Sequence, residues 1–255
     1  MTARSGFHAL LQGLGALLPG DYLKTAFYLN AIAKPRVALR RALTAFYRMD
    51  HVYAVLQQVK RDYQGRFSIL EFGTHDGYGF TKILYATKHL GMSDRVMVRA
   101  FDSFEGMPAP ADRRDSNIIE SGELFAPGQY RGRYEELDAY CRARYANYAL
   151  HRGFFEASLT PDVLQVLEQD LPILIWIDCD YYSSSLTVFE RVLPYLPSGC
   201  VVYFDDFELN YGSRLTGEAR LVYELNHGSL GDGIELVLDR ELSLDSQRVY
   251  RFVRF

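Results

Sequence analysis

The chain has 255 residues, of which 48% are hydrophobic and 24% are charged, and this is the composition of a globular protein rather than a disordered or fibrous one. Its formal net charge of −4 argues against a nucleic-acid-binding protein. No segment approaches the run of ~18 apolar residues that spans a membrane. Three widely separated cysteines, without a C-x-x-C pair, are typical of a reducing cytosol, so a cytoplasmic location is expected.

Residues 1–64 are expected to form an N-terminal helical layer. The apolar run Leu10–Leu18 is separated by Pro19 and Gly20 from a cleavage-like Ala31-Ile32-Ala33, and this spacing disfavours a signal peptide. Residues 36–63 have a helical pattern. Four of its apolar side chains share one face: Val52, Val55, Leu56 and Val59. This layer could pack on the main domain, form the contact of a homo-oligomer, or be a surface for a membrane or a carrier partner.

Residues 65–255 are expected to form one α/β domain. The apolar run Phe67–Phe72 predicts a buried strand, and the Gly-rich turn Gly73–Gly79 leads into a helix that ends near Leu90, just before Gly91. A second strand at Arg95–Phe101 completes a βαβ unit, which indicates a parallel sheet.

Further strands are expected at Tyr148–Phe155, Ile173–Ile177, Gly199–Phe204, Ile234–Leu238 and Arg248–Phe255. Helices are expected from Thr160-Pro161, across Leu186–Leu196 and near Glu218–Asn226. The alternation predicts a Rossmann-like, doubly wound sheet of about seven strands, mostly parallel, closed by an antiparallel C-terminal pair.

Residues 105–147 interrupt this alternation. The segment contains Pro108, Pro110 and Pro127 and a dense mixture of Arg, Asp, Glu and Tyr, with a short helix expected near 134–144. Long irregular insertions in compact domains are usually functional lids or disordered segments. The aromatic content favours an ordered lid.

Acidic residues stand where predicted strands end. Asp178 follows Ile-Trp-Ile, and Asp205-Asp206 follow Val-Val-Tyr-Phe. Because neighbouring parallel strands lie about 4.8 Å apart, these carboxylates can converge at one sheet edge, where they would repel one another without a cation. All-oxygen ligands suit Mg²⁺, Mn²⁺ or Ca²⁺ rather than zinc. Asp180 lies two residues from Asp178, so it is expected to face the same place.

The first turn, Glu71–Gly79, lets a ligand approach the backbone closely. It lacks the third glycine of a dinucleotide fingerprint and the Lys of a P-loop. The acid beside it suits a ligand with a positive group. Asp102 ends the second strand, where an acid typically binds ribose hydroxyls, so the two together predict a nucleoside ligand without a pyrophosphate. His75 lies in this turn and could accept a proton.

In these turn and strand-end residues, the chain resembles class I S-adenosylmethionine (SAM) dependent methyltransferases, and most closely the macrocin O-methyltransferase (TylF/MycF-like) family. The matching segments are ILEFGTHDGYG at 69–79, FDSFEGMP at 101–108, RGFFEASL at 152–159, WIDCDYYSSS at 176–185 and SGCVVYFDDF at 198–207. Cys200 stands where the family usually has a second glycine. The segment before Tyr63 and the tail after Asp206 also differ from the family pattern.

The resemblance implies a role for each matching residue. Glu71, Gly73 and Thr74 would line the amino-acid part of SAM within the turn that Gly79 closes, and Asp102 would bind its ribose. Ser103, Phe104 and Glu105 would lie against the nucleoside. Asp178, Asp205 and Asp206 would hold Mg²⁺ or Mn²⁺. The cation would lower the pKa of an acceptor hydroxyl on a sugar, a glycan or another diol. Asp180 or His75 would take the proton.

Three other interpretations stay open on the sequence. One is a nicotinamide-dependent oxidoreductase, which the missing third glycine and the acidic sheet edge disfavour. Another is a non-catalytic SAM-binding module that docks a partner through the N-terminal helices. The third is a methyltransferase that works without a metal.

Overall fold

The computed structural model describes residues 17, 49–115, 125–243 and 247–255. Contacts divide the chain into Met1–Asp50 and His51–Phe255, and the second unit contains every strand described below. The predicted helical layer before residue 49 lies outside the described residues, apart from residue 17. The boundary predicted at residue 64 stays a prediction. In the part of the chain that the structure describes, no helix is long and apolar enough to cross a membrane.

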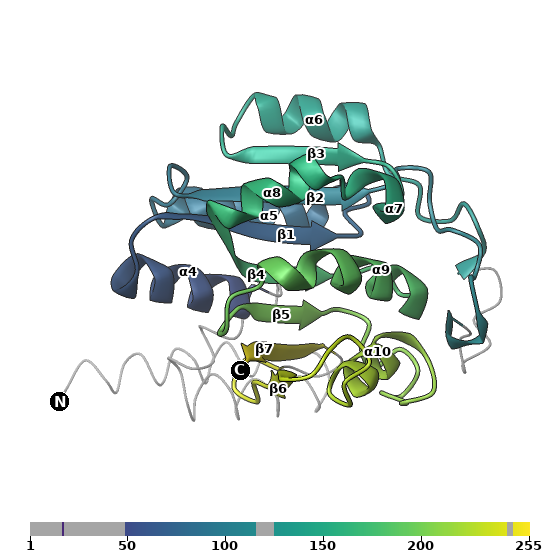
Figure 1. Ribbon diagram of the computed structural model, residues 1–255. Coiled ribbons are helices and arrows are strands. Elements are labelled where there is room, and N and C mark those ends of the chain that lie inside the picture. The colour runs from purple at the N-terminus through teal and green to yellow at the C-terminus, as the bar shows by residue number, and fades with distance from the viewer. Residues whose placement is uncertain (1–16, 18–48, 116–124, 244–246) are drawn as a thin grey trace. The chain divides into compact units, whose positions relative to one another are not determined.

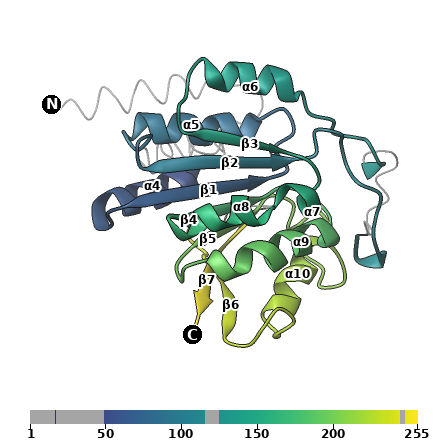
Figure 2. The same cartoon turned by 45° about the horizontal axis from the view of Figure 1, so that its top comes forward.

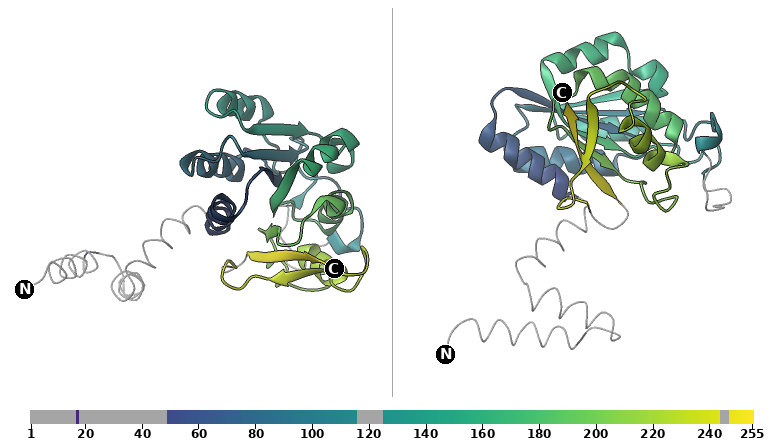
Figure 3. Two further views of the ribbon diagram at one scale, coloured as in Figure 1. Left: turned by 60° about the vertical axis from the view of Figure 1, so that its left-hand side comes forward. Right: turned by 60° about the horizontal axis from the view of Figure 1, so that its bottom comes forward.

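The second unit is built on a seven-stranded sheet with the order β3-β2-β1-β4-β5-β7-β6 (Figure 1). The strands are β1 (Arg66–Phe72), β2 (Val96–Asp102), β3 (Tyr148–Arg152), β4 (Asp170–Ile177), β5 (Val201–Phe204), β6 (Ile234–Leu238) and β7 (Arg248–Arg254). β1 to β5 are parallel, whereas β7 runs antiparallel to both β5 and β6. Figure 3 shows this antiparallel pair at one end of the sheet. The predicted fold class is therefore confirmed.

Helices cover both faces of the sheet (Figure 2). The α-helices are α4 (Asp50–Asp62), α5 (Tyr78–His89), α6 (Tyr134–Arg142), α7 (Phe155–Ser158), α8 (Pro161–Gln165), α9 (Tyr182–Val192) and α10 (Gly217–Leu225). The described residues also form the short 3-10 helices η2 (Arg113–Asp115), η4 (Val166–Glu168) and η5 (Leu193–Tyr195). α4 and α5 cover one face, α7 to α10 cover the other, and α6 lies along the edge strand β3.

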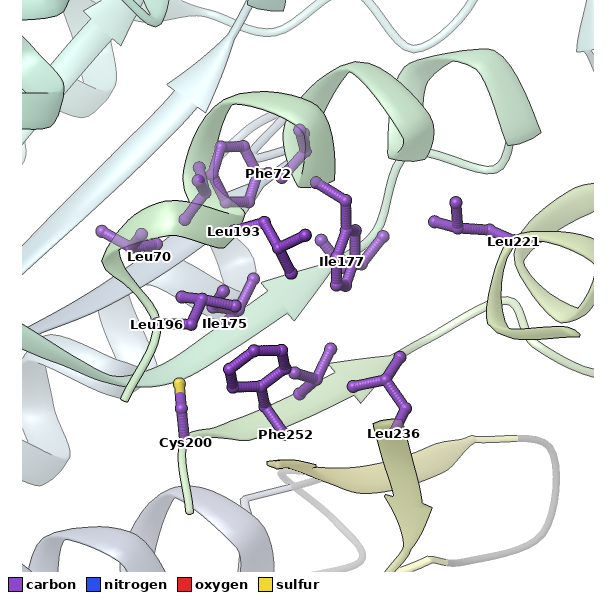
Figure 4. Packing of buried hydrophobic residues seen from close by; sticks show 14 of the residues in the cluster. Leu70, Phe72, Ile175, Ile177, Leu193, Leu196, Cys200, Leu221, Leu236 and Phe252 are labelled. Carbon is purple, nitrogen blue, oxygen red and sulfur yellow. The ribbon is translucent and has the colours of Figure 1, made fainter. Parts of the chain in front are cut away.

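The continuous apolar runs of β1 and β4 are explained by this double cover, because a strand buried on both faces needs no polar alternation. Along β4, Ile175 and Ile177 point into the hydrophobic core under α9 and α10 (Figure 4). Trp176 alternates with them and contacts His51 of α4 on the other face. The four aligned apolar side chains of α4 are all 6% exposed or less, as their helical spacing predicts.

Two predicted boundaries are wrong for identifiable reasons. The strand expected at Tyr148–Phe155 ends at Arg152, because Gly153 has a φ of +133° and turns the chain into α7. The helix expected to reach Leu196 ends at Val192 and continues as a 3-10 turn. Pro194 lacks the N–H that another α-helical turn would need. The predicted cap at Thr160-Pro161 is confirmed, since the Thr160 side chain accepts a hydrogen bond from Val163 N.

His51 ties α4 to the central strands. Its ring stacks on Tyr203 of β5 with centroids 4.0 Å apart and planes 8° from parallel, and it lies 4.9 Å from the ring of Trp176. The side chain is 3% exposed, and its Nε2 has no hydrogen-bond partner. Burial therefore lowers the pKa of His51 to about 3, so the ring is neutral near neutral pH.

We expect His51→Phe to remove part of the acid sensitivity of the fold. The unfolded chain takes up a proton near the ordinary pKa of 6.5, whereas the folded chain does so only near a pKa of about 3. The stability that the neutral ring contributes is thus complete above pH 6.5 and is lost as the pH falls towards 3. Between about pH 7 and about pH 4.5 the wild type should lose about 2–3 kcal/mol more than the variant.

Urea unfolding at the two pH values, followed by the fluorescence of the single Trp176, measures this difference. Groups that titrate in both proteins cancel in the comparison. An equal loss of stability in wild type and variant would contradict the account of His51.

Candidate functional site

The register of four parallel strands places their carboxyl ends at one level. Phe72 of β1 pairs with Phe101 of β2 and with Ile177 of β4, and Ile177 pairs with Phe204 of β5. The ladder hydrogen bonds continue one residue further, from Gly73 N to Phe101 O, from Asp178 N to Phe72 O and from Asp205 N to Ile177 O. The next residues of all four strands therefore open onto the same edge.

The strand order also reverses at this edge. β2 and β3 extend from one side of β1, whereas β4 and β5 extend from the other. In open α/β sheets, ligands bind in the crevice outside the carboxyl ends of the strands at such a reversal. The candidate site thus lies between two parts of this edge. One is the end of β1 with the Gly-rich turn that follows it (residues 71–79, called the β1 turn), and the other is formed by the loops after β4 and β5.

The structure brings together the three predicted cation ligands. One carboxylate oxygen from each of Asp178, Asp205 and Asp206 lies within 4.8 Å of the others, and all three residues are half-buried. Burial raises the pKa of Asp178 well above its usual range, and the charges of Asp205 and Asp206 raise it further. Three clustered carboxylates of this kind fit a divalent cation with oxygen ligands.

Asp180 lies beside this group, as predicted. Burial raises the pKa of Asp180 well above its usual range. The charge of Asp206 and a hydrogen bond shared with Asp206 raise this pKa further. Its backbone has a φ of +58°. The contrast with the opposite edge of the sheet is clear, because there Asp170 accepts hydrogen bonds from the guanidinium groups of Arg66 and Arg99 at 2.8 and 2.9 Å.

Next to the Gly-rich turn, the end of β1 carries a buried acid. Glu71 is 1% exposed, and its Oε2 has no hydrogen-bond partner. Burial raises the pKa of Glu71 to about 8, and the charges of Asp102 and Asp205 act in the same direction. A cationic group at this position would remove the cost of the buried charge. Thr74 is buried beside it, at 4% exposure.

Two glycines of the predicted cofactor site occupy positions where a side chain would not fit. A Cβ on Gly73, whose φ is +92°, would lie 1.7 Å from the backbone oxygen of Asp178. A Cβ on Gly79 would lie 2.3 Å from Glu71 Oε1. The glycines thus let the β1 turn approach both the β4 loop and the buried carboxylate.

Asp102 holds the loops after β1 and β2 together. Its Oδ2 accepts a hydrogen bond from His75 N at 2.7 Å, and its Oδ1 accepts one from Phe104 N at 2.6 Å. Both donors have positive φ, 50° for His75 and 55° for Phe104. A carboxylate accepts about four hydrogen bonds, so lone pairs of Asp102 are left for a ligand's hydroxyls.

The other predicted nucleoside-binding residues follow Asp102. The Ser103 hydroxyl donates to Gly106 O and accepts from Glu105 N, each at 3.0 Å, so it shapes this turn. Phe104 is buried and packs edge-on against Tyr134 of α6, with centroids 5.1 Å apart. Glu105 is exposed. Its side chain therefore has room to contact a ligand or solvent.

His75 is set apart from the acidic group by its contacts. Its ring is exposed and lies edge-on to Tyr130 of the insertion, 6.0 Å between centroids. A Cβ on Gly132 would lie 2.4 Å from the His75 backbone oxygen, so the insertion covers this turn closely. Arg133 fixes the contact through Asp76, with Nη2 2.9 Å from the carboxylate.

The first part of the insertion is anchored on the other side of the site. The buried Asp115 accepts hydrogen bonds from Ser183 N and Ser183 Oγ, both at 2.8 Å, and from Ala111 N at 2.7 Å. Thr216 donates to Arg114 O at 2.7 Å. Ser183 lies in the first turn of α9 and is the donor in both of its bonds to Asp115, so the insertion supplies the capping carboxylate.

Sequence reasoning missed three residues of this site. Asp115 is one, and Tyr203, which donates to Asp205, is another. The third is Glu218, which is 1% exposed and has no hydrogen-bond partner on either carboxylate oxygen. Burial and then the charges of Asp206 and Asp180 raise its pKa well above the usual range. An acid in the first turn of a helix usually indicates only a favourable helix end, so no sequence signal distinguished it.

Backbone strain is concentrated around this edge. Within the described ranges, five residues other than glycine have positive φ: His75, Phe104, Tyr130, Asp180 and Tyr211. They come from the loops after β1, β2, β4 and β5. Such conformations cost of order 1–3 kcal/mol each and cluster at functional sites.

Comparison with known proteins agrees with the geometry. The methyltransferase domain family matches residues 70–207. No curated protein sequence matches the chain. The solved structure of the O-methyltransferase NovP covers 82% of this chain and 80% of its own, with 16% identity and a TM-score of 0.59. The calicheamicin methyltransferase CalS11 covers 98% of this chain and 93% of its own, with 21% identity and a TM-score of 0.60. At these identities the structural similarity shows the fold alone.

We expect Gly73→Ala to destabilise the protein more than Gly199→Ala. The two glycines have nearly the same φ, +92° and +93°, but a Cβ on Gly199 has nothing within 4 Å. The control variant should lose about 1–2 kcal/mol from backbone strain alone. The free energy of unfolding of Gly73→Ala should fall by about 1–3 kcal/mol more than that of the control, because the added Cβ displaces the Asp178 backbone.

Urea unfolding of the two variants beside the wild type measures both losses. Equal losses would mean that the close approach of the β1 turn to Asp178 does not constrain the site.

Proposed function

Because this chain belongs to the methyltransferase domain family, we propose that it is an O-methyltransferase that moves the methyl group of SAM to a hydroxyl of a sugar or other small polyhydroxyl compound. The chain is a SAM-dependent methyltransferase. The finer proposal concerns the atom that is methylated, the cation and the substrate class. The observation that carries it is the convergence of Asp178, Asp205 and Asp206 beside the β1 turn.

Relatives by fold support the choice of acceptor. NovP is described as an O-methyltransferase, and the apo structure of CalS11 is described as a TDP-rhamnose 3'-O-methyltransferase of calicheamicin biosynthesis. The latter is 19% identical, has a TM-score of 0.55 and covers 98% of this chain and 95% of its own. We propose that this chain also methylates a hydroxyl group. We further propose that it is a member of the macrocin O-methyltransferase (TylF/MycF-like) family.

The β1 turn would bind SAM. Its buried Glu71 carboxylate, with one unpartnered oxygen, suits the ammonium group of the SAM amino acid, and the close glycines leave room for it. Asp102 would accept hydrogen bonds from the ribose hydroxyls. SAM supplies an electrophilic methyl group on a sulfonium, whose positive charge is favoured at this acidic edge.

Asp178, Asp205 and Asp206 would hold Mg²⁺ or Mn²⁺, and the cation would lower the pKa of an acceptor hydroxyl. We propose Asp180 as the proton acceptor because it shares a hydrogen bond with Asp206 and so lies next to the cation ligands. His75 remains the second candidate, but its ring lies against Tyr130 of the insertion. The insertion would exclude water and align oxygen, methyl and sulfur.

Three further parts of the proposal rest on the sequence. A cytoplasmic location is favoured by three unpaired thiols. We propose a homo-oligomer formed through the N-terminal residues because these contain an apolar run. We propose no nucleic-acid partner because the net charge is −4.

We expect Asp178→Asn to separate the cofactor from the cation. Calorimetry should show SAM binding to wild type and variant alike, and a Mg²⁺ signal only in the wild type. On any sugar or catechol acceptor that the wild type methylates, EDTA and Asp178→Asn should each reduce turnover at least about 100-fold. Asp94→Asn is the matched control, because Asp94 is exposed and precedes β2 at the opposite edge of the sheet.

Other outcomes of this experiment would lead to different conclusions. A wild type that binds no SAM would contradict the proposed cofactor site. Turnover that survives EDTA would identify a methyltransferase without a metal. SAM binding with no turnover on any acceptor would favour a non-catalytic module.

A further inference from the structure

Tyr203 donates a hydrogen bond to one of the three clustered carboxylates. Its hydroxyl donates to Asp205 Oδ1, with 2.5 Å between the oxygens. Tyr203 lies on β5, two residues before Asp205, and is 2% exposed. A buried tyrosine usually finds a partner for its hydroxyl, but here that partner is a residue at the mouth of the candidate site.

Two neighbouring rings pack against the ring of Tyr203. His51 stacks on it at 4.0 Å and 8°, and Trp176 of β4 lies 4.4 Å away at 49°. Trp176 is also the register partner of Tyr203 in the sheet. A ring that packs against both a helix and a neighbouring strand has little freedom, so the position of its hydroxyl is set by the core.

The hydrogen bond acts against a repulsion that the cluster creates. One carboxylate oxygen of Asp205 lies within 4.8 Å of one of Asp178, so the two carboxylates repel each other when ionised. Without restraint, the Asp205 side chain would rotate away from Asp178 when no cation is bound. A hydrogen bond from a hydroxyl to a carboxylate is short and strong, and it occupies one lone pair of one oxygen.

The chemistry of the donor matters as much as its position. A lysine or arginine in this place would cancel part of the negative charge that attracts a cation. A tyrosine hydroxyl is neutral at neutral pH, so it orients Asp205 and leaves the charge of the cluster intact. Partners of metal-binding carboxylates that act in this way typically change metal affinity 10–100-fold when removed.

We propose that Tyr203 is a positioning residue that holds Asp205 in place for a divalent cation, with His51 and Trp176 holding the tyrosine ring. This inference rests on the proposed cation site of Asp178, Asp205 and Asp206. It adds a connection from that site through β5 to α4. The core face of α4 thereby contributes to cation binding without touching the cation.

The test is direct Mg²⁺ titration by calorimetry on the full chain, in the absence of acceptor. Tyr203→Phe removes only the hydroxyl and should weaken Mg²⁺ binding at least about 10-fold, with SAM affinity unchanged within about two-fold. Tyr148→Phe is the matched control. The Tyr148 hydroxyl also donates to an aspartate, Asp138, at 2.8 Å, but it does so at the edge strand β3. This control should bind Mg²⁺ like the wild type.

Thermal unfolding in EDTA separates positioning from simple loss of structure. Both tyrosine variants should unfold cooperatively and within a few degrees of each other, because each loses one Tyr–Asp hydrogen bond. A Mg²⁺ affinity that falls only in Tyr203→Phe supports the proposal. Equal Mg²⁺ affinities in Tyr203→Phe and wild type would overturn the role of Tyr203 and leave the cation site standing. A wild type that binds no Mg²⁺ would overturn the cation site and this inference with it.

Discussion

The alignment of four strand ends is the constraint on which the site depends. Phe72, Phe101, Ile177 and Phe204 stand at one level of the sheet, so the residues after them meet at one edge. The core beneath fixes this register, because a shift by one residue would move every buried side chain to the wrong face. The free energy of burying that core holds several carboxylates closer together than they would lie in a flexible chain. The acidic edge is therefore imposed by apolar packing.

Two positive groups would relieve this crowding. The raised pKa of Glu71 and that of Asp178 both reflect carboxylates that are costly to ionise where they stand. The ammonium of SAM at the first and a divalent cation at the second would each convert that cost into binding. The glycine at position 73 allows the two places to approach, since its neighbour across the turn is the backbone of Asp178 itself. Strained residues in the surrounding loops are consistent with a site assembled for binding rather than for stability.

Much of this could be predicted from the sequence, because strand ends and glycine turns are local signals. The acids at 178, 205 and 206 stand out because they come directly after two apolar runs, and the fold class follows from the alternation of elements. The contacts that hold the site could not be predicted. Asp115 reaches Ser183 across 68 residues, and the stack of His51 on Tyr203 depends on which face of α4 meets β5. The strand that ends early at Arg152 was obscured because a glycine's φ cannot be read from its letter.

The most direct test of the central claim is a crystal of the full chain grown with Mn²⁺ and S-adenosylhomocysteine, measured at the manganese absorption edge. We expect one strong anomalous peak within coordination distance of Asp178, Asp205 and Asp206, with the amino group of the cofactor product at Glu71. A fully occupied cofactor product with no manganese peak between the three aspartates would contradict it.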